Sequence, residues 1–247
     1  MSMDKETKIS AILFFTIVIS LIVIVSVGLN ADRKIVWPVT ISFMLIMFMA
    51  IGWSIKGRLL GVLINERKSM SLSRFQIALW TLIVLSAYVS IAFFRARDCG
   101  VTALDVAVPA EVWMLMGISS AALVGSPLLA SNKTKKVPAD TNLKEREEMG
   151  ILSVKDNDSK ASFTDLFKGV EVKNWDYVDM PRLQMFFFTS IVAIAYCVEV
   201  YKIVSTGDLS NDISLPTIDQ GMVTLMGISN AAYLGGKSID QTPAKAK

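Results

Sequence analysis

The sequence predicts an all-α polytopic membrane protein with about six transmembrane helices, a tandem parallel repeat of a two-helix hairpin and a cytoplasmic insert. Three observations predict this class. Of the 247 residues, 53% are hydrophobic and only 19% are charged, whereas a water-soluble domain carries about 25% charged residues. Long uncharged stretches recur along the chain, and a set of polar motifs occurs twice at a nearly fixed spacing.

The composition also excludes several classes of function. The chain has no histidine, so it lacks the most common general base and metal ligand. We therefore expect no catalytic residue, no metal site and no cofactor. The formal net charge is only +3, and no basic motif with interleaved aromatic residues points to a nucleic-acid partner.

Helices that cross a bilayer need about 20 consecutive apolar residues. Stretches without charge and close to that length cover residues 9–29, 35–55, 75–94 and 112–130. Residues 183–204 are apolar except for Glu199 and Lys202. The sixth candidate, 220–236, is shorter, so it is either a tilted span or a re-entrant segment.

Positive charge orients these spans, because cytoplasmic loops are enriched in lysine and arginine. The segment between the second and third spans carries a single acid, Glu66, against five bases: Lys56, Arg58, Arg67, Lys68 and Arg74. This segment is predicted to be cytoplasmic, while the 205–215 loop has no base and is predicted to be external. Six spans then place both termini in the cytoplasm of a multi-pass inner-membrane protein.

The predicted domains follow the changes in composition. They are an N-terminal hairpin (1–56), a first membrane repeat with its cytoplasmic lead-in (57–130), a polar insert (131–166), and a second repeat with its lead-in and tail (167–247). The insert has nearly balanced charge, which predicts a solvated linker that ends in a more ordered part, and a surface for a cytoplasmic protein partner.

An internal repeat links the two halves of the chain. Four polar residues recur 108 positions later: Arg74, Gln76, Thr81 and Tyr88 match Arg182, Gln184, Thr189 and Tyr196. The sequence Leu-Met-Gly-Ile-Ser occurs at 115–119 and again at 225–229. Both copies run in the same direction, which favours a pseudo-two-fold axis along the membrane normal.

The same motifs resemble those of an uncharacterised family of bacterial polytopic membrane proteins. The resemblance lies in Ser-Leu-Ser-Arg-Phe-Gln at 71–76 with Trp80-Thr81, in Arg-Leu-Gln-Met-Phe-Phe-Phe-Thr at 182–189, and in the two Leu-Met-Gly-Ile-Ser segments. It covers residues 58–237 and implies a bacterial source and no particular activity.

The repeated polar residues allow two interpretations. Arg74, Thr81 and Tyr88 lie seven residues apart on one helix face, as do their counterparts, and Glu199 extends the second stripe. They either line a polar path, or they reach the headgroups and bond within the helix bundle. Gln76 and Gln184 have the same two alternatives. Glu199 also has Lys202 three residues later as an ion-pair partner.

Two further patterns concern helix packing and acidic residues. Small residues recur every fourth position, at Gly117, Ala121 and Gly125 and again at Gly227, Ala231 and Gly235. This spacing predicts close helix packing, with a gating hinge as the alternative. Glu111 and Asp219 follow prolines at the predicted outer helix starts, where they either ring a pore mouth or cap their helices.

These patterns favour a homo-oligomeric channel or pore-like protein for ions or small solutes, surrounded by the lipid bilayer. The alternative is a membrane scaffold or sensor-effector, without catalytic activity, that acts through its cytoplasmic insert. An intramembrane enzyme is the third class, and it would depend on Ser119, Ser229, Glu111 or Asp219, for which the sequence shows no partner base. We therefore predict that the protein is not an enzyme.

Overall fold

Helices make up nearly all the secondary structure in the computed structural model, which describes residues 5–99, 102–134, 153, 155–171, 174–206 and 214–238. Within these ranges, the backbone pairs only in isolated β-bridges and forms no strand. The predicted all-α class is therefore confirmed. The six α-helices of the described ranges are α1 (Lys5–Asn30), α2 (Arg33–Lys56), α3 (Leu72–Phe94), α4 (Ala110–Thr134), α6 (Met180–Thr206) and α7 (Gln220–Ser238).

Short polar and glycine signals set the limits of α2. Asp32 lies just before it, and its side chain accepts a hydrogen bond from the backbone N–H of Lys34 at 2.9 Å. Gly57 ends the helix in the left-handed conformation, with φ of 65°, which glycine adopts at little cost. A loop of only two residues separates α1 from α2, and the two helices pack together.

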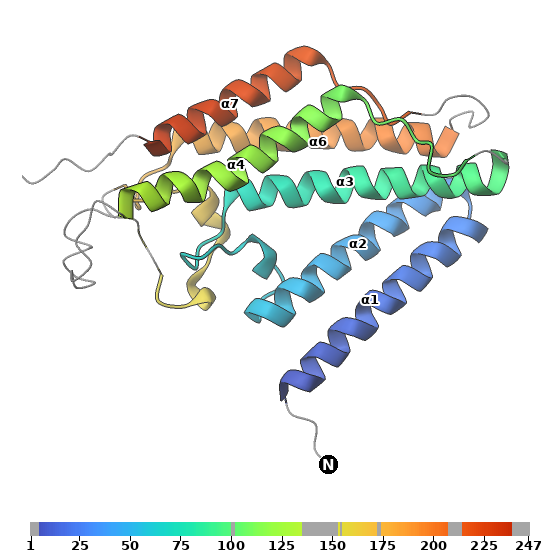
Figure 1. The fold of residues 1–247 in the computed structure, drawn as a ribbon, viewed down its shortest axis with the longest axis horizontal. Helices are drawn as coiled ribbons and strands as arrows, with labels where there is room; N and C mark the ends of the chain where they lie inside the picture. Colours follow the sequence, from blue (N-terminus) through green and yellow to red (C-terminus); the bar gives the residue numbers. More distant parts are fainter. Residues whose placement is uncertain are drawn as a thin grey trace, which may run out of the picture. The chain divides into compact units, whose positions relative to one another are not determined.

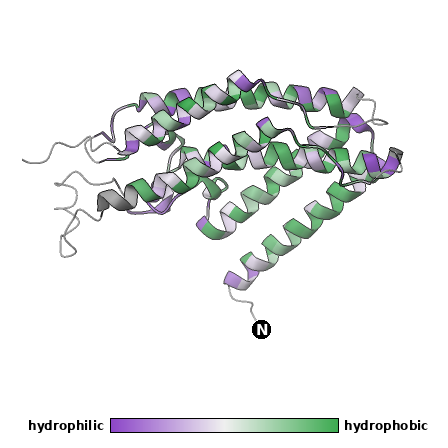
Figure 2. Cartoon of the chain, turned by 45° about the horizontal axis from the view of Figure 1, so that its top comes forward, coloured by the Kyte–Doolittle hydropathy of each residue, from purple (hydrophilic) through white to green (hydrophobic). Residues whose placement is uncertain are grey.

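Five of the helices are long and apolar enough to cross a membrane: α1, α2, α3, α4 and α6. Figure 2 shows the apolar character most clearly along α1. Helix α7 is not among the five, since Thr224, Ser229, Asn230 and Lys237 lower the apolar character of its 19 residues. Five of the six predicted spans are thus helices that are long and apolar enough to cross a membrane, and the sixth span stays a prediction.

The chain forms two compact units. Unit 1 contains Met1–Val62, Ala78–Trp113 and Val192–Ile218, and unit 2 contains Leu63–Ile77, Met114–Ile191 and Asp219–Lys247. Helices α3, α4 and α6 contribute residues to both units. This grouping combines residues of both predicted repeats, so the four predicted domains along the sequence stay a prediction.

Unit 1 joins the N-terminal hairpin to α3 and α6. Gly28 of α1 lies directly against the ring of Phe93 in α3, where a Cβ atom would approach that ring to 2.2 Å. Trp37 of α2 donates from its indole N–H to Ser86 Oγ of α3 at 3.0 Å, and its ring lies 6.4 Å from that of Tyr201 in α6. Close backbone approach and aromatic packing therefore hold this unit together.

Unit 2 contains the α4–α7 pair (Figure 1). Asn230 of α7 donates from its side-chain amide to the backbone oxygen of Ile118 in α4 at 2.9 Å. The buried residues of α7 fall on one face and include Val223, Met226 and Tyr233. This face fixes α7 within the unit through packing as well as through polar contacts.

Candidate functional site

The structure brings together two of the predicted path residues, Gln76 of α3 and Thr189 of α6. Gln76 Nε2 donates to Thr189 Oγ1 at 2.6 Å, and both side chains are buried. Gln76 Oε1 has no hydrogen-bond partner among the described residues. The two residues come from different predicted repeats, so this hydrogen bond links the copies rather than occurring once in each.

The hydrogen bond between Gln76 and Thr189 is expected to couple the effects of their substitutions on the free energy of unfolding. In a double-mutant cycle of Gln76→Leu and Thr189→Val, we expect a coupling of about 0.6–1.7 kcal/mol, the range for polar pairs between membrane helices. Unfolding of the full chain in detergent measures it. The matched control combines Gln184→Leu with Thr189→Val, because Gln184 is exposed. An equal coupling in both cycles would contradict the assignment.

Equivalent positions of the two predicted copies have different surroundings. Arg74 is partly exposed and lies 2.7 Å from Glu66 in an ion pair, whereas Arg182 is buried. The Thr81 side chain is half-buried, whereas that of Thr189 is fully buried.

The tyrosines of the two copies also differ. Tyr88 donates to the backbone oxygen of Leu104 at 2.7 Å. The Tyr196 hydroxyl is buried without a hydrogen-bond partner in the described part of the chain, and its ring packs against Trp80. The repeat therefore stays a prediction from sequence, and its copies differ in local environment.

Local contacts explain two of the predicted acidic site residues. Glu199 is exposed, and its carboxylate lies 3.3 Å from the Lys202 ammonium. Asp219 accepts from the backbone N–H of Gly221 at 2.8 Å, at the start of α7. Glu111 is half-buried in the first turn of α4. The position of Glu199 suits the ion-pair interpretation. The positions of Glu111 and Asp219 suit the helix-start interpretation, because carboxylates are favourable near helix N-termini.

The predicted packing residues divide into two groups. Gly125 lies against Leu234, and Gly227 lies against Ile118, where an added Cβ would come within 3.5 Å and 3.8 Å of these side chains. The other four are exposed and face away from the α4–α7 contact: Gly117, Ala121, Ala231 and Gly235.

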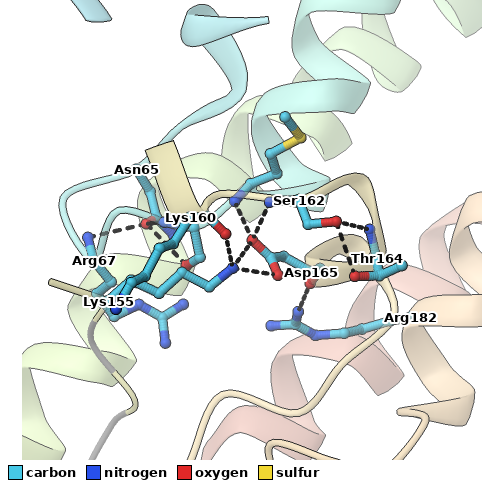
Figure 3. A network of polar contacts seen from close by, with 10 residues as sticks. Asn65, Arg67, Lys155, Lys160, Ser162, Thr164, Asp165 and Arg182 are labelled. Atoms are coloured by element: carbon cyan, nitrogen blue, oxygen red, sulfur yellow. Dashed lines mark hydrogen bonds and ion pairs between the residues drawn. The ribbon is translucent and has the colours of Figure 1, made fainter. Parts of the chain in front are cut away.

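A buried carboxylate that sequence analysis did not select, Asp165, organises unit 2 (Figure 3). Its two oxygens each lie 2.7 Å from Lys155 Nζ. One oxygen also accepts from the backbone N–H groups of Met70 at 3.2 Å and Ser162 at 2.9 Å. These donors satisfy both oxygens of the buried carboxylate, as a polar group removed from water requires.

The same region connects to the start of α6. Arg182 donates from Nη1 to the backbone oxygen of Asp165 at 3.2 Å, and its Nε lies 3.3 Å from Asp179 Oδ2. The rings of Phe163 and Phe167 pack against Phe186 of α6, with ring centroids 6.1 Å and 4.9 Å apart. The described part of the segment 155–179 is therefore docked on α6.

The insert was predicted to be a solvated linker that ends in a more ordered part. At that end, residues 155–166 carry the buried Asp165 and Leu166. Residues 135–152 and 154 of the insert lie outside the described residues. One sequence signal was present: Ser162 and Asp165 stand three residues apart as a capping box, which the structure contains.

We compared the chain with protein-family models, curated proteins and solved structures. None of them matches it. The resemblance to a bacterial membrane family therefore stays a prediction.

Proposed function

We propose that this membrane protein is a scaffold or sensor-effector that couples its polar insert to helices α3 and α6. The observation that supports this most is the position of Asp165. Its carboxylate binds the Met70 N–H, two residues before α3, and its backbone oxygen accepts from Arg182 in the first turn of α6. One insert residue thus contacts the approaches to two apolar helices.

Such coupling has a direct thermodynamic consequence. Consider two arrangements of the insert, one with Asp165 in contact with the starts of α3 and α6 and one with Asp165 shifted away. A partner that binds one arrangement more tightly changes the stability of these helix starts, by an amount set by the difference between its two affinities. The excess of basic residues between α2 and α3 favours a cytoplasmic location for these ends. We therefore propose a cytoplasmic protein as the partner of the insert.

Hydrogen exchange of the full chain in lipid nanodiscs tests the coupling. Asp165→Asn is expected to raise amide exchange at residues 72–77 and 180–186. Asp156→Asn is the matched control, because this exposed carboxylate forms its ion pair with the exposed Lys160. Equal exchange in both variants would remove the basis of the proposal.

A photo-crosslinker at the exposed Phe163 position tests the partner itself. In living cells, we expect a crosslinked protein whose yield falls in the Asp165→Asn background and not in the Asp156→Asn background. If the insert variants change neither the crosslinked species nor any phenotype, the sensor-effector role is wrong even where the exchange result holds.

A second candidate is the homo-oligomeric channel or pore for ions or small solutes. The exposed small residues of α4 and α7 favour it, because such positions let helices of neighbouring copies approach closely. In this arrangement a path would form between copies, with Glu111 and Asp219 near its outer mouth. Ion or solute flux through liposomes that contain the purified protein tests this candidate.

Enlarging one of these small residues is expected to disrupt an oligomer. Gly117→Leu should lower the association constant at least about tenfold, equivalent to about 1.4 kcal/mol. Analytical ultracentrifugation in detergent measures it, with Ile194→Phe on the exposed face of α6 as a control. A monomeric wild-type chain, or equal association of both variants, would argue against the oligomer.

The inner-membrane location with both termini in the cytoplasm is also a proposal. It requires α7 to cross the membrane, because five spans would leave the termini on opposite sides. Two reporters are fused in turn after Lys247: one that is active only in the cytoplasm and one that is active only outside it. We expect activity from the cytoplasmic reporter alone. An externally active reporter would exclude α7 as a span.

A further inference from the structure

A short hairpin just before α6 carries three large apolar side chains that the described residues of the chain leave exposed. Tyr177, Val178 and Met180 are each between 60% and 72% exposed. Neighbouring exposed apolar residues beside polar ones mark a contact site for another protein or for a membrane. We call these three side chains the 177–180 patch.

Backbone hydrogen bonds fix the hairpin that displays the patch. The N–H of Gly169 donates to the backbone oxygen of Tyr177 at 3.3 Å. The N–H of Asp179 donates to the backbone oxygen of Phe167 at 2.8 Å. The ring of Phe167 packs on that of Phe186 in α6, with ring centroids 4.9 Å apart. The patch is therefore held against the first two turns of α6.

The patch continues into the exposed face of α6. Met180 is the first residue of this helix, and Phe187 and Ile191 follow seven and eleven positions later, each more than half exposed. Since an α-helix turns by about 100° per residue, these three side chains lie within about 20° of one direction. Helix α6 is long and apolar enough to cross a membrane, so lipid is the natural cover of this apolar face. The patch thus adjoins a surface suited to lipid.

The length of α6 sets the depth of the patch in a bilayer. Its 27 residues span about 40 Å at about 1.5 Å per residue, whereas the hydrocarbon core is about 30 Å thick. The ends of α6 therefore reach the headgroup layers even at the usual tilt of about 20°. Gln184, one turn after Met180, is exposed and polar, which suits the same layer.

The chemistry of the patch also suits the headgroup layer. Tyrosine is enriched there, because its ring is apolar and its hydroxyl can stay hydrated. Charges of both signs lie next to the patch, on Lys168, Asp176 and Asp179. Binding through apolar contact rather than through net charge needs no particular headgroup charge.

We propose that the 177–180 patch is a membrane-interface anchor, which lies in the lipid headgroup layer and holds the docked insert at the membrane surface. The hairpin begins where the insert ends, at residues 167 and 166. The anchor therefore sets the distance between the buried Asp165 and the bilayer. This inference depends on α6 crossing the membrane and not on the proposed coupling of the insert to α3 and α6.

Spin labels on the full chain in phosphatidylcholine nanodiscs test the depth of the patch. Cys99 and Cys197 are first replaced by alanine. The labels are then attached to the single-cysteine variants Tyr177→Cys, Met180→Cys, Phe187→Cys and Asp156→Cys. Collisions with oxygen, which concentrates in lipid, and with a water-soluble nickel chelate report the depth of each label. Asp156→Cys is the water reference, because Asp156 is an exposed residue of the insert outside the patch.

We expect the Met180 label to lie about 10 Å closer to water than the Phe187 label, since seven residues separate them at about 1.5 Å each. Both patch labels should collide more with oxygen and less with nickel than the Asp156 label. Phosphatidylglycerol and high salt should leave these depths unchanged. Val178→Cys replaces either patch variant if that variant unfolds at a lower temperature than the wild type.

Three results would overturn the anchor, each in a different way. Patch labels as open to nickel as the Asp156 label would place the hairpin in water. Patch labels closed to both reagents would show a protein, either a partner or a second copy, in place of lipid. A nickel-accessible Phe187 label would show that α6 does not cross the membrane. None of these results alters the hydrogen-exchange test of Asp165, so failure of the anchor and failure of the coupling are distinguishable.

Discussion

Replacing Asp165 by alanine is expected to lower the free energy of unfolding by about 3–5 kcal/mol, as for a broken buried ion pair. The side chains of Asp165 and Lys155 are only 2% and 12% exposed. The substitution leaves the Lys155 ammonium without its carboxylate and the N–H groups of Met70 and Ser162 without their acceptor. Chemical unfolding of the full chain in detergent measures the loss.

The exposed pair of Asp156 and Lys160 provides the control for this prediction. Its two atoms lie 2.6 Å apart, closer than those of the Asp165 pair, but its side chains are 84% and 61% exposed. Exposed ion pairs contribute little to stability, so Asp156→Ala should leave the unfolding transition unchanged. If Asp165→Ala behaves like Asp156→Ala, the docked insert does not stabilise unit 2.

Replacing Gly61 by alanine is expected to lower the free energy of unfolding by about 1–3 kcal/mol, the range for overpacking. A Cβ atom on Gly61 would lie 2.3 Å from the backbone oxygen of Gly52 in α2. Backbone atoms cannot rotate away as the end of a side chain can, so α2 and the turn at 61–63 must separate. Thermal unfolding and exchange at residues 50–56 measure the effect.

Gly236→Ala is the matched control, because nothing lies within 4 Å of the position that its Cβ would take. In an open helical position, alanine is favoured over glycine by about 0.5–1 kcal/mol. The two Gly→Ala changes should therefore have opposite signs. Destabilisation by both would point to the loss of glycine flexibility rather than to the contact between Gly61 and Gly52.

The apolar stretches predicted most of the helices because they are long and bounded by polar or glycine residues. The 35–55 stretch became α2 at Arg33–Lys56, and the 183–204 stretch became the longer α6 at Met180–Thr206. Bilayer-length apolar runs leave few alternatives to a helix, since backbone groups in lipid must be paired within the segment. Helix α7 was harder to predict because its polar residues support packing within the unit.

The candidate site could be predicted only in part. The sequence selected Gln76 and Thr189 but could not pair them, because they lie 113 residues apart. It missed Asp165, whose partner Met70 is also distant in the chain. Identity between repeats fixes the residue type and not its surroundings, so Arg74 and Arg182 looked equivalent although one is partly exposed and the other buried.

The distance between Met70 and Asp165 also sets an order of assembly. Their hydrogen bond joins residues 95 positions apart, and translation adds about 5–20 residues per second. The start of α3 must therefore leave the ribosome several seconds before its carboxylate partner is made. The Met70 N–H is therefore without its Asp165 acceptor while the whole of α3 is made, so the contact that joins the insert to the start of α3 forms only after that helix has been synthesised.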